Sequence, residues 1–191
     1  MRRLATWLLL TGVLASTGLP CTRILWNENS FGVLAARSMD WPESTEPVLW
    51  FLPRGMDRDG AKCGGETVVK ENPLHWSSKY ASLITSIYGV GSVDGMNEKG
   101  LGGHLLYLAK TDFGARDPKK KGVSAILWLQ YALDQASTVQ EALNLLQKVQ
   151  PVMIQSHGHD ATIHLALEDK SGDSAIIEYI NGKPKVHHAG K

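Results

Sequence analysis

Apolar and polar positions alternate with a period of two along much of this chain, which is the pattern of half-buried β-strands. Clusters of Gly, Asn, Asp and Ser bound the alternating runs, and Asn181-Gly182 is a typical two-residue hairpin turn. We therefore expect strands over residues 22–26, 32–38, 48–52, 80–88, 93–96, 101–108, 162–167, 174–180 and 184–188.

The middle of the chain changes to a helical period. Apolar residues recur at three- and four-residue spacing over residues 123–134 and again over residues 138–148. Ser137 or Thr138 is a suitable N-cap for the second segment, and Glu141 follows in capping-box position. Two helices are thus predicted between the early and the late strands.

The order of strands, two helices and strands again predicts an α+β fold rather than a repeated βαβ unit. Paired antiparallel sheets with helices packed outside them fit this order. Residues 54–75 are polar and Gly-rich, and we expect them to form a long surface loop, a kind of segment that is often functional. Neither a helix nor a polar tail follows the last strand, so we expect the chain to be incomplete at its C-terminus.

Residues 1–20 have the pattern of a secretory signal peptide, because two arginines precede an apolar run that ends in small residues. Cleavage after Gly18 would leave Leu19-Pro20 as a short propeptide to be trimmed. A lipoprotein anchor at Cys21 is an alternative, although Leu-Pro lacks the usual pair of small residues. We expect the mature chain to be secreted or periplasmic.

Composition excludes several classes of function. The 191 residues carry 20 basic and 19 acidic side chains, and this balance gives no electrostatic footprint for nucleic acid or a membrane surface. No apolar run reaches the ~20 residues of a membrane span. The His-Gly-His-Asp run at residues 157–160 lacks a further ligand cluster at suitable spacing. We therefore expect a solvated loop there, and neither a metal nor a cofactor.

The strongest candidate for chemistry is Cys21, which follows the leader directly and precedes Arg37 and Asp40. At a free N-terminus the α-amine, with a pKa of about 8, can take the thiol proton and return it to a leaving amine. Arg37 would stabilise the thiolate and Asp40 would orient the amine. From residue types alone, a structural cysteine beside a surface ion pair is the stronger explanation, and a Cys21–Cys63 disulfide is a further alternative.

Longer motifs change this balance. The opening CTR (residues 21–23) followed by ARSMDW (residues 36–41) resembles the choloylglycine hydrolase family. These are N-terminal-nucleophile enzymes that include penicillin V acylases and bile salt hydrolases. The resemblance continues at PRG (residues 53–55), at DGMNEKGL (residues 94–101) and at VHH (residues 186–188), so that it spans the whole mature part. The cysteine start and the Asn-Glu-Lys-Gly-Leu turn, in this order and spacing, are specific together.

By this resemblance Cys21 is the nucleophile, and Arg37 and Asp40 are its activating neighbours. The position that lines the oxyanion hole falls on Tyr107, where penicillin V acylases typically have Tyr and bile salt hydrolases Asn. Tyr107 would offer its backbone N–H to the tetrahedral intermediate, the alternative being an aromatic side chain packed into a core. The family's second oxyanion-hole residue, an Asn, and a further active-site Arg come later than His188 and have no counterpart in this chain.

The resemblance implies an αββα sandwich of the N-terminal-nucleophile type, with residues 21–191 as the N-terminal part of one domain. It implies cofactor-free hydrolysis of a linear, non-peptide amide through an acyl-thioester. A penicillin V acylase-like enzyme that also acts on N-acyl homoserine lactones is the expectation, with a bile salt hydrolase or a non-catalytic relative as alternatives. It further implies a homo-oligomer, a tetramer, with a small-molecule amide as partner and no nucleic acid or membrane anchor.

Overall fold

A computed structural model describes residues 21–156 and 158–190, so the expectations for the leader and for residue 157 lie outside it. In the described part, no helix is long and apolar enough to cross a membrane. The elements are β1 (Arg23–Trp26), β2 (Leu34–Arg37), β3 (Val48–Leu52), β4 (Asp57–Asp59), β5 (Lys62–Cys63), β6 (Glu66–Thr67), β7 (His75–Ser77), β8 (Ser82–Ile87), β9 (Gly91–Asn97), β10 (Leu101–Tyr107), β11 (Lys121–Ser124), the 3-10 turn η1 (Ala125–Leu127), α1 (Trp128–Gln135), α2 (Val139–Leu146), β12 (Val149–Val152), β13 (Gln155–Ser156), β14 (His159–Asp160), β15 (Ile163–Asp169), β16 (Ser174–Ile180) and β17 (Lys183–Gly190).

The scaffold is a seven-stranded sheet in the order β17-β16-β15-β10-β9-β8-β3, and every neighbouring pair is antiparallel. Tight turns set its register. Asn181 and Gly182 both have positive φ, 51° and 73°, as a two-residue hairpin turn between β16 and β17 requires. The strands predicted from alternation are confirmed, and so is this turn.

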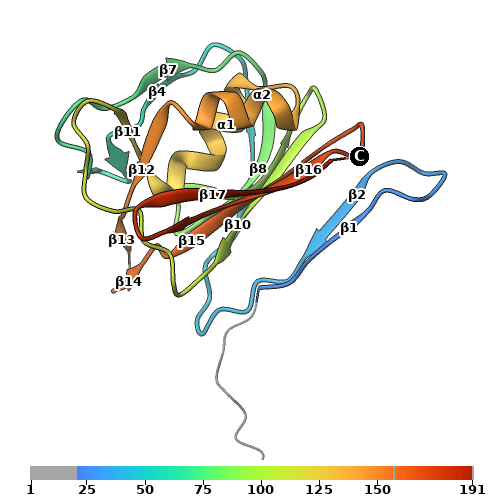
Figure 1. Cartoon of the computed structure of the whole chain (residues 1–191), viewed down its shortest axis with the longest axis horizontal. Helices are drawn as coiled ribbons and strands as arrows, with labels where there is room; N and C mark the ends of the chain where they lie inside the picture. Colours follow the sequence, from blue (N-terminus) through green and yellow to red (C-terminus); the bar gives the residue numbers. More distant parts are fainter. Residues whose placement is uncertain (1–20, 157, 191) are drawn as a thin grey trace, which may run out of the picture.

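Both helices pack on one face of the sheet (Figure 1). Leu129 and Leu133 of α1 are fully buried there, against a layer that includes Leu165 and Leu167 of β15. Gly103 of β10 permits the close approach, because a Cβ at that position would lie 2.6 Å from Leu129 Cδ1. The apolar stripes of the two helices thus form the core with the inner face of the sheet.

The β1–β2 hairpin lies on the opposite side of the sheet from the helices (Figure 1). Arg23 reaches the sheet through Leu167 O (3.4 Å) and Arg37 through Leu105 O (2.5 Å). The layers are therefore helices, a seven-stranded sheet and a facing pair of strands, which confirms the α+β class. On this side large apolar residues are exposed; they are Ile24 and Trp26 of the hairpin and Leu49, Phe51, Leu83 and Met96 of the sheet.

The helix predicted over residues 123–134 begins later than expected. Its first residues belong to β11, which pairs parallel with β12 and places Val123 opposite Pro151. The turn η1 follows, and α1 starts only at Trp128. Val123 and Ser124 are fully buried, and a short buried strand has the same apolar character as the start of a buried helix. For the second helix, Thr138 is the N-cap, and its side chain accepts from Glu141 N–H.

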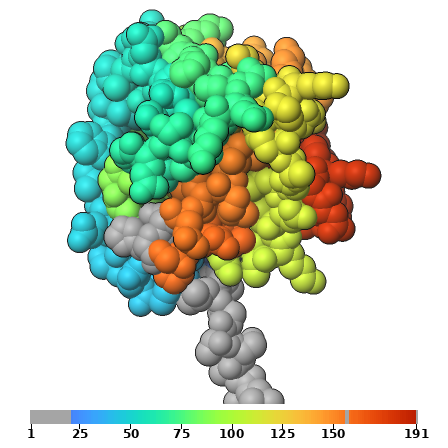
Figure 2. All heavy atoms as spheres, turned by 90° about the vertical axis from the view of Figure 1, so that its left-hand side faces the viewer, coloured from blue at the N-terminus to red at the C-terminus, as the bar shows by residue number. Residues whose placement is uncertain are grey.

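Residues 54–75 are more ordered than the predicted surface loop. They hold the short antiparallel pair β5–β6 and most of the pair β4–β7, and they bury Val69 and Leu74. Figure 2 shows this excursion, in cyan to green, spread over the upper part of one face above the orange β12–β14 segment. The segment thus lies at the surface as predicted, but it is not a plain loop, because it forms short strands and two of its side chains are buried.

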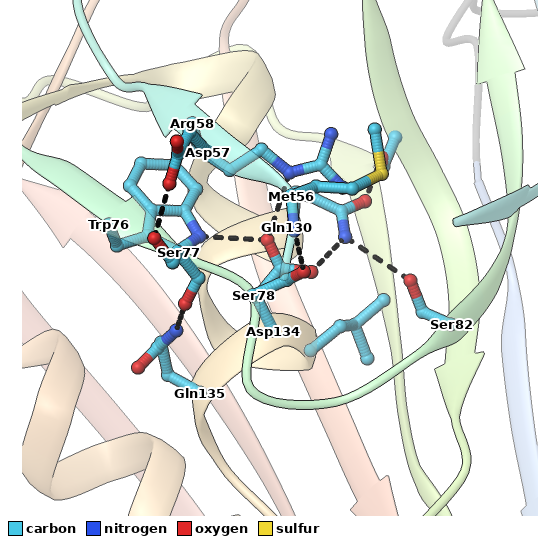
Figure 3. A network of polar contacts seen from close by, with 12 residues as sticks. Met56, Asp57, Arg58, Trp76, Ser77, Ser78, Ser82, Gln130, Asp134 and Gln135 are labelled. Carbon is cyan, nitrogen blue, oxygen red and sulfur yellow. Dashed lines mark hydrogen bonds and ion pairs between the residues drawn. The ribbon is translucent and has the colours of Figure 1, made fainter. Parts of the chain in front are cut away.

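A buried carboxylate ties the excursion to α1 (Figure 3). Asp134 Oδ2 accepts from Trp76 Nε1 (2.8 Å) and from Arg58 Nε (3.1 Å), while Oδ1 accepts from Gln130 Nε2 (2.7 Å). Gln130 Nε2 also lies 3.2 Å from Ser82 Oγ of β8. Asp134 is fully buried, so these donors replace the water that its charge would otherwise need.

Candidate active site

Cys21 is held at the open end of the β1–β2 hairpin. The pairing of Arg23 with Arg37 continues one step further, because Ser38 N–H donates to Thr22 O (2.9 Å). Thr22 N–H in turn lies 3.3 Å from Ser38 Oγ. The strand pairing thus brings the predicted nucleophile beside the residues that follow β2, as the hairpin predicted from the sequence requires.

Arg37 lies between the hairpin and the sheet, with its side chain only 8% exposed. Its Nη2 donates to Leu105 O (2.5 Å), and its Nε lies 3.3 Å from Asp94 Oδ1. Among the described residues, Nη1 has no hydrogen-bond partner. A buried guanidinium with a free donor can stabilise a negative charge that develops beside it.

Asp40 has a different position from the other predicted residues. It is exposed and is not among the described residues that line the pocket around Cys21. Its Oδ2 accepts from Ser38 Oγ (3.1 Å), and that hydroxyl also contacts Thr22 N–H. Asp40 is therefore linked to the backbone next to Cys21 through one hydroxyl rather than by direct contact.

Tyr107 places a backbone donor near Arg37. Leu108 N–H donates to Thr162 O, so the neighbouring N–H, that of Tyr107, points away from β15 and toward the side of β9. The described β9–β10 ladder covers only the three residues from Gly102 to His104, which leaves this edge of β10 open beyond it. Leu105 O points the same way and is the acceptor for Arg37. The open edge thus presents an N–H donor beside a buried cation.

Cys21, Arg37 and Tyr107 line a single pocket, with a volume of about 90 Å³. The rest of its wall is mainly apolar and comes from both sides of the split between β9 and β10; it includes Met39, Trp41, Ile87, Val90, Val93, Leu105, Ile126, Ile154 and Ile163. An apolar pocket with few polar groups at one end is the usual form of a small-molecule site.

Trp41 is the central aromatic residue of this wall. Its ring meets Tyr107 edge-on at 6.0 Å between centroids and His159 at 5.2 Å. Its Nε1 donates to Tyr88 Oη (2.9 Å), and Tyr88 donates to Glu43 Oε1 (2.7 Å). Burial raises the pKa of Tyr88, and the hydrogen bond to Glu43 raises it further, so the phenol keeps its proton and this bond at neutral pH.

The sequence did not point to every residue of the site. His159 and Asp160 were expected in a solvated loop, but they form β14 and line the pocket beside Trp41. That position depends on a contact between distant segments, and no local pattern predicts it. Asp94, which faces Arg37, belongs to the DGMNEKGL motif, and that motif was the available signal.

The two cysteines are both free, so the alternative of a Cys21–Cys63 disulfide does not hold. Cys63 lies in β5 of the excursion. Burial raises the pKa of its thiol, and the nearby Glu66 carboxylate adds to the effect. The two thiols therefore have separate surroundings, and only Cys21 lies with Arg37 and Tyr107.

Comparison with known proteins agrees with this geometry. The family model for linear amide C–N hydrolases of the choloylglycine hydrolase family matches residues 21–191. A penicillin V acylase from Pectobacterium atrosepticum is 40% identical over a match that covers 92% of this chain and 48% of that protein. The chain thus spans about half the length of the curated relatives it matches.

Solved structures give the same relation. The penicillin V acylase from Agrobacterium tumefaciens superposes with a TM-score of 0.73 at 42% identity, over 87% of this chain and 49% of that one. A variant of the conjugated bile acid hydrolase from Clostridium perfringens gives a TM-score of 0.72 at 26% identity, over 88% and 51%. The fold is therefore that of the N-terminal-nucleophile hydrolases, and the chain belongs to the choloylglycine hydrolase family of linear amide C–N hydrolases.

Proposed function

We propose that the full-length protein is a cysteine N-terminal-nucleophile hydrolase that cleaves linear, non-peptide amides. One observation carries the proposal: Cys21, the buried guanidinium of Arg37 and the open strand edge at Tyr107 share one apolar pocket. A thiol, a cation and an N–H donor at one end of an apolar space suit an acyl group whose carbonyl is attacked at that end.

The chemistry requires a free Cys21 amine. That amine takes the thiol proton while Sγ bonds to the amide carbon and the C=O electron pair moves to oxygen, where the Tyr107 N–H stabilises it. Collapse breaks the C–N bond, and the ammonium proton passes to the departing amine. Water then attacks the thioester and gives a proton to the amine. The C–S bond breaks, the acid leaves, and the proton returns to the thiolate.

Pocket size favours a slender acyl group. About 90 Å³ is below the roughly 300 Å³ at which drug-sized ligand pockets begin. Together with Tyr107, this supports a penicillin V acylase-like enzyme, in which Trp41 contacts an aromatic or alkyl acyl chain. N-acyl homoserine lactones have such a chain on a linear amide, and we propose them as natural substrates. Conjugated bile acids remain the alternative substrate, supported by the likeness to a bile acid hydrolase.

Incubation of the full-length protein with penicillin V, an N-acyl homoserine lactone and glycocholate tests the proposal. Release of acid from either of the first two, and loss of release in Cys21→Ala, is the expected result. Cys63→Ala is the matched control and should keep its activity, because Cys63 lies in the excursion. Release from glycocholate alone would select the bile salt alternative, and no release from any of the three would favour a non-catalytic relative.

Maturation, export and assembly are further parts of the proposal. We propose that removal of residues 1–20 exposes the Cys21 amine outside the cytoplasm, and that the mature protein forms a tetramer. N-terminal sequencing of active protein should begin at Cys21, and light scattering should give four times the chain mass. Active material that still carried the leader would contradict the mechanism, because the amine could then not accept the thiol proton.

A further inference from the structure

His104 of β10 lies between two carboxylates on the hairpin side of the sheet. Its Nδ1 is 2.8 Å from Asp94 Oδ1 of β9, and its Nε2 is 3.0 Å from Glu168 Oε1 of β15. The residue is buried, with 8% of its surface exposed. Both ring nitrogens therefore face acceptors in a region with little solvent.

This geometry requires a particular protonation state. A neutral imidazole has one N–H, so its other nitrogen would place a lone pair against a carboxylate. Only the imidazolium donates at both nitrogens. Burial alone lowers the pKa of His104, but the hydrogen bonds to Asp94 and Glu168 outweigh it and the pKa is raised. Glu168 is the counterpart: burial favours its neutral form, but its bonds to His104 and Arg23 hold its pKa below the ordinary value.

Each carboxylate also binds an arginine of the Cys21 hairpin. Glu168 Oε2 is 2.5 Å from Arg23 Nη2, and Asp94 Oδ1 is 3.3 Å from Arg37 Nε. The charges form an alternating row, Arg37–Asp94–His104–Glu168–Arg23, across β2, β9, β10, β15 and β1. Its ends lie at the site, since Arg37 lines the pocket and Arg23 is two residues from Cys21.

His164 of β15 is a further titratable group, and it lies within electrostatic reach of Arg37 at one end of the row. Burial lowers the pKa of His164. Glu178 raises this pKa and Arg37 lowers it, but both effects are smaller than that of burial. His164 therefore loses its proton at a lower pH than His104 does. Among the groups of the row, His104 is the one whose charge we expect to change near neutral pH.

We propose that His104 is a positioning residue for the Cys21 site, whose imidazolium fixes Asp94 and Glu168 and, through them, Arg37 and Arg23. This inference rests on the proposed function, since it concerns the hairpin that presents the nucleophile. As the pH rises and the ring loses its proton, one carboxylate keeps only its arginine as a partner and its orientation is less firmly fixed. The arginine of the hairpin that binds this carboxylate is then less well positioned, and turnover falls.

The test uses the full-length protein with His104→Gln, which is neutral at every pH and keeps one donor. His75→Gln is the matched control, because His75 also faces a carboxylate, Asp59 at 3.6 Å, but lies in β7, away from the hairpin. We expect the wild-type kcat to fall on the alkaline side with KM unchanged. His104→Gln should lower kcat about tenfold or more at pH 6 and abolish that pH dependence. Glu168→Gln should move the fall to lower pH, because it removes a charge that favours the imidazolium.

Two further measurements do not require turnover. The ¹⁵N shifts of the His104 ring should show both nitrogens protonated at pH 6, whereas a neutral ring would overturn the proposal. The rate of Cys21 alkylation by iodoacetamide, measured by mass spectrometry, reports on the hairpin directly. A changed pH profile in His104→Gln supports the positioning role even if no amide is cleaved, in which case the proposed function alone fails. If His104→Gln is folded and its Cys21 alkylation rate has the same pH profile as that of the wild type, the positioning role of His104 is overturned.

Discussion

Two buried polar networks lie on opposite faces of the main sheet, and they differ in what their protons can do. On the helix side, Asp134 accepts from an indole, a guanidinium and an amide, none of which loses a proton near neutral pH (Figure 3). On the hairpin side, His104 donates to two carboxylates and can lose a proton in that range. The first network has a fixed charge pattern, and the second a variable one.

The difference matches what each network connects. Asp134 joins the excursion to α1 within the core. Its loss leaves buried donors without an acceptor, and this lowers the stability of the fold. The His104 row joins two layers next to Cys21, so its change moves the site more than it weakens the fold. Two networks of similar burial thus have separate consequences, and substitutions can separate them.

The largest expected effect is that of Asp134→Ala. It leaves the Arg58 guanidinium, the Trp76 indole and the Gln130 amide without their shared acceptor. Removing one partner of a buried ion pair costs about 3–5 kcal/mol in the free energy of unfolding. Urea denaturation of the full-length protein measures it. Asp134→Asn, which keeps an acceptor oxygen, should lose less, and a loss below about 1 kcal/mol in the Ala variant would contradict a structural role.

Adjacent glycines of β10 offer the next comparison, because they face opposite sides of the sheet: Gly103 faces the apolar core under α1, and Gly102 faces Glu168 of the His104 row. A Cβ at Gly103 would lie 2.6 Å from Leu129 Cδ1 and 2.8 Å from Leu167 Cδ2, on the helix side. Gly103→Ala should therefore destabilise the protein by about 1–3 kcal/mol through overpacking. The loss appears as a lower urea midpoint with an unchanged slope, and an unchanged midpoint would show that α1 can shift without cost.

Gly102→Ala is the matched substitution on the hairpin side. A Cβ there would collide with Glu168 Oε1, the atom that faces His104 Nε2. Because a carboxylate is the end of a flexible side chain, it can turn aside, and we expect a smaller loss of stability than in Gly103→Ala. Turnover and Cys21 alkylation should change more than in Gly103→Ala. Equal effects of the two glycines on both properties would remove the distinction between the helix side and the hairpin side of the sheet.

The local parts of the structure were predictable from the sequence because short-range chemistry determines them. Alternation located the strands, Asn181-Gly182 located a hairpin turn, and Thr138 with Glu141 located a helix start. Cys21 and Arg37 could be placed together for the same reason, since one hairpin connects them.

Contacts between distant segments were not predictable in this way. The parallel pairing of β11 with β12 removed the expected first turn of α1. His159 reaches the pocket because Trp41 packs against it across the fold. Glu168 lies far along the chain from Arg23, and nothing in its surrounding sequence indicates that pairing. A single sequence contains no local signal for such contacts, except where a family motif includes one partner, as with Asp94.

The pH dependence of stability separates the networks without mutation. A group whose pKa is raised on folding stabilises the protein fully below its unfolded value and loses that contribution as the pH rises through the folded value. For His104 the stabilisation is thus complete below about pH 6.5 and declines above it. Urea midpoints across pH 6–9 should fall in the wild type and fall less in His104→Gln. If the urea midpoints of the wild type and of His104→Gln fall in parallel, the loss of stability comes from other titratable groups.

The smallest expected effect concerns an exposed ion pair that belongs to neither network. The hydrogen bonds from Arg54 and from Ala81 N–H lower the pKa of Glu98 to about 2. Because this pKa is depressed, its stabilising contribution is complete above the unfolded value of about 4.5 and is lost progressively as the pH falls from there through about 2. NMR titration of the Glu98 carboxylate should show it ionised at pH 3.5, and Arg54→Gln should raise its pKa. Stability near neutral pH should hardly change in that variant, since solvent screens the pair. An exposed pair can therefore have a large pKa shift and little influence on the fold. The buried groups differ: loss of Asp134 lowers stability, and loss of the His104 charge changes the Cys21 site.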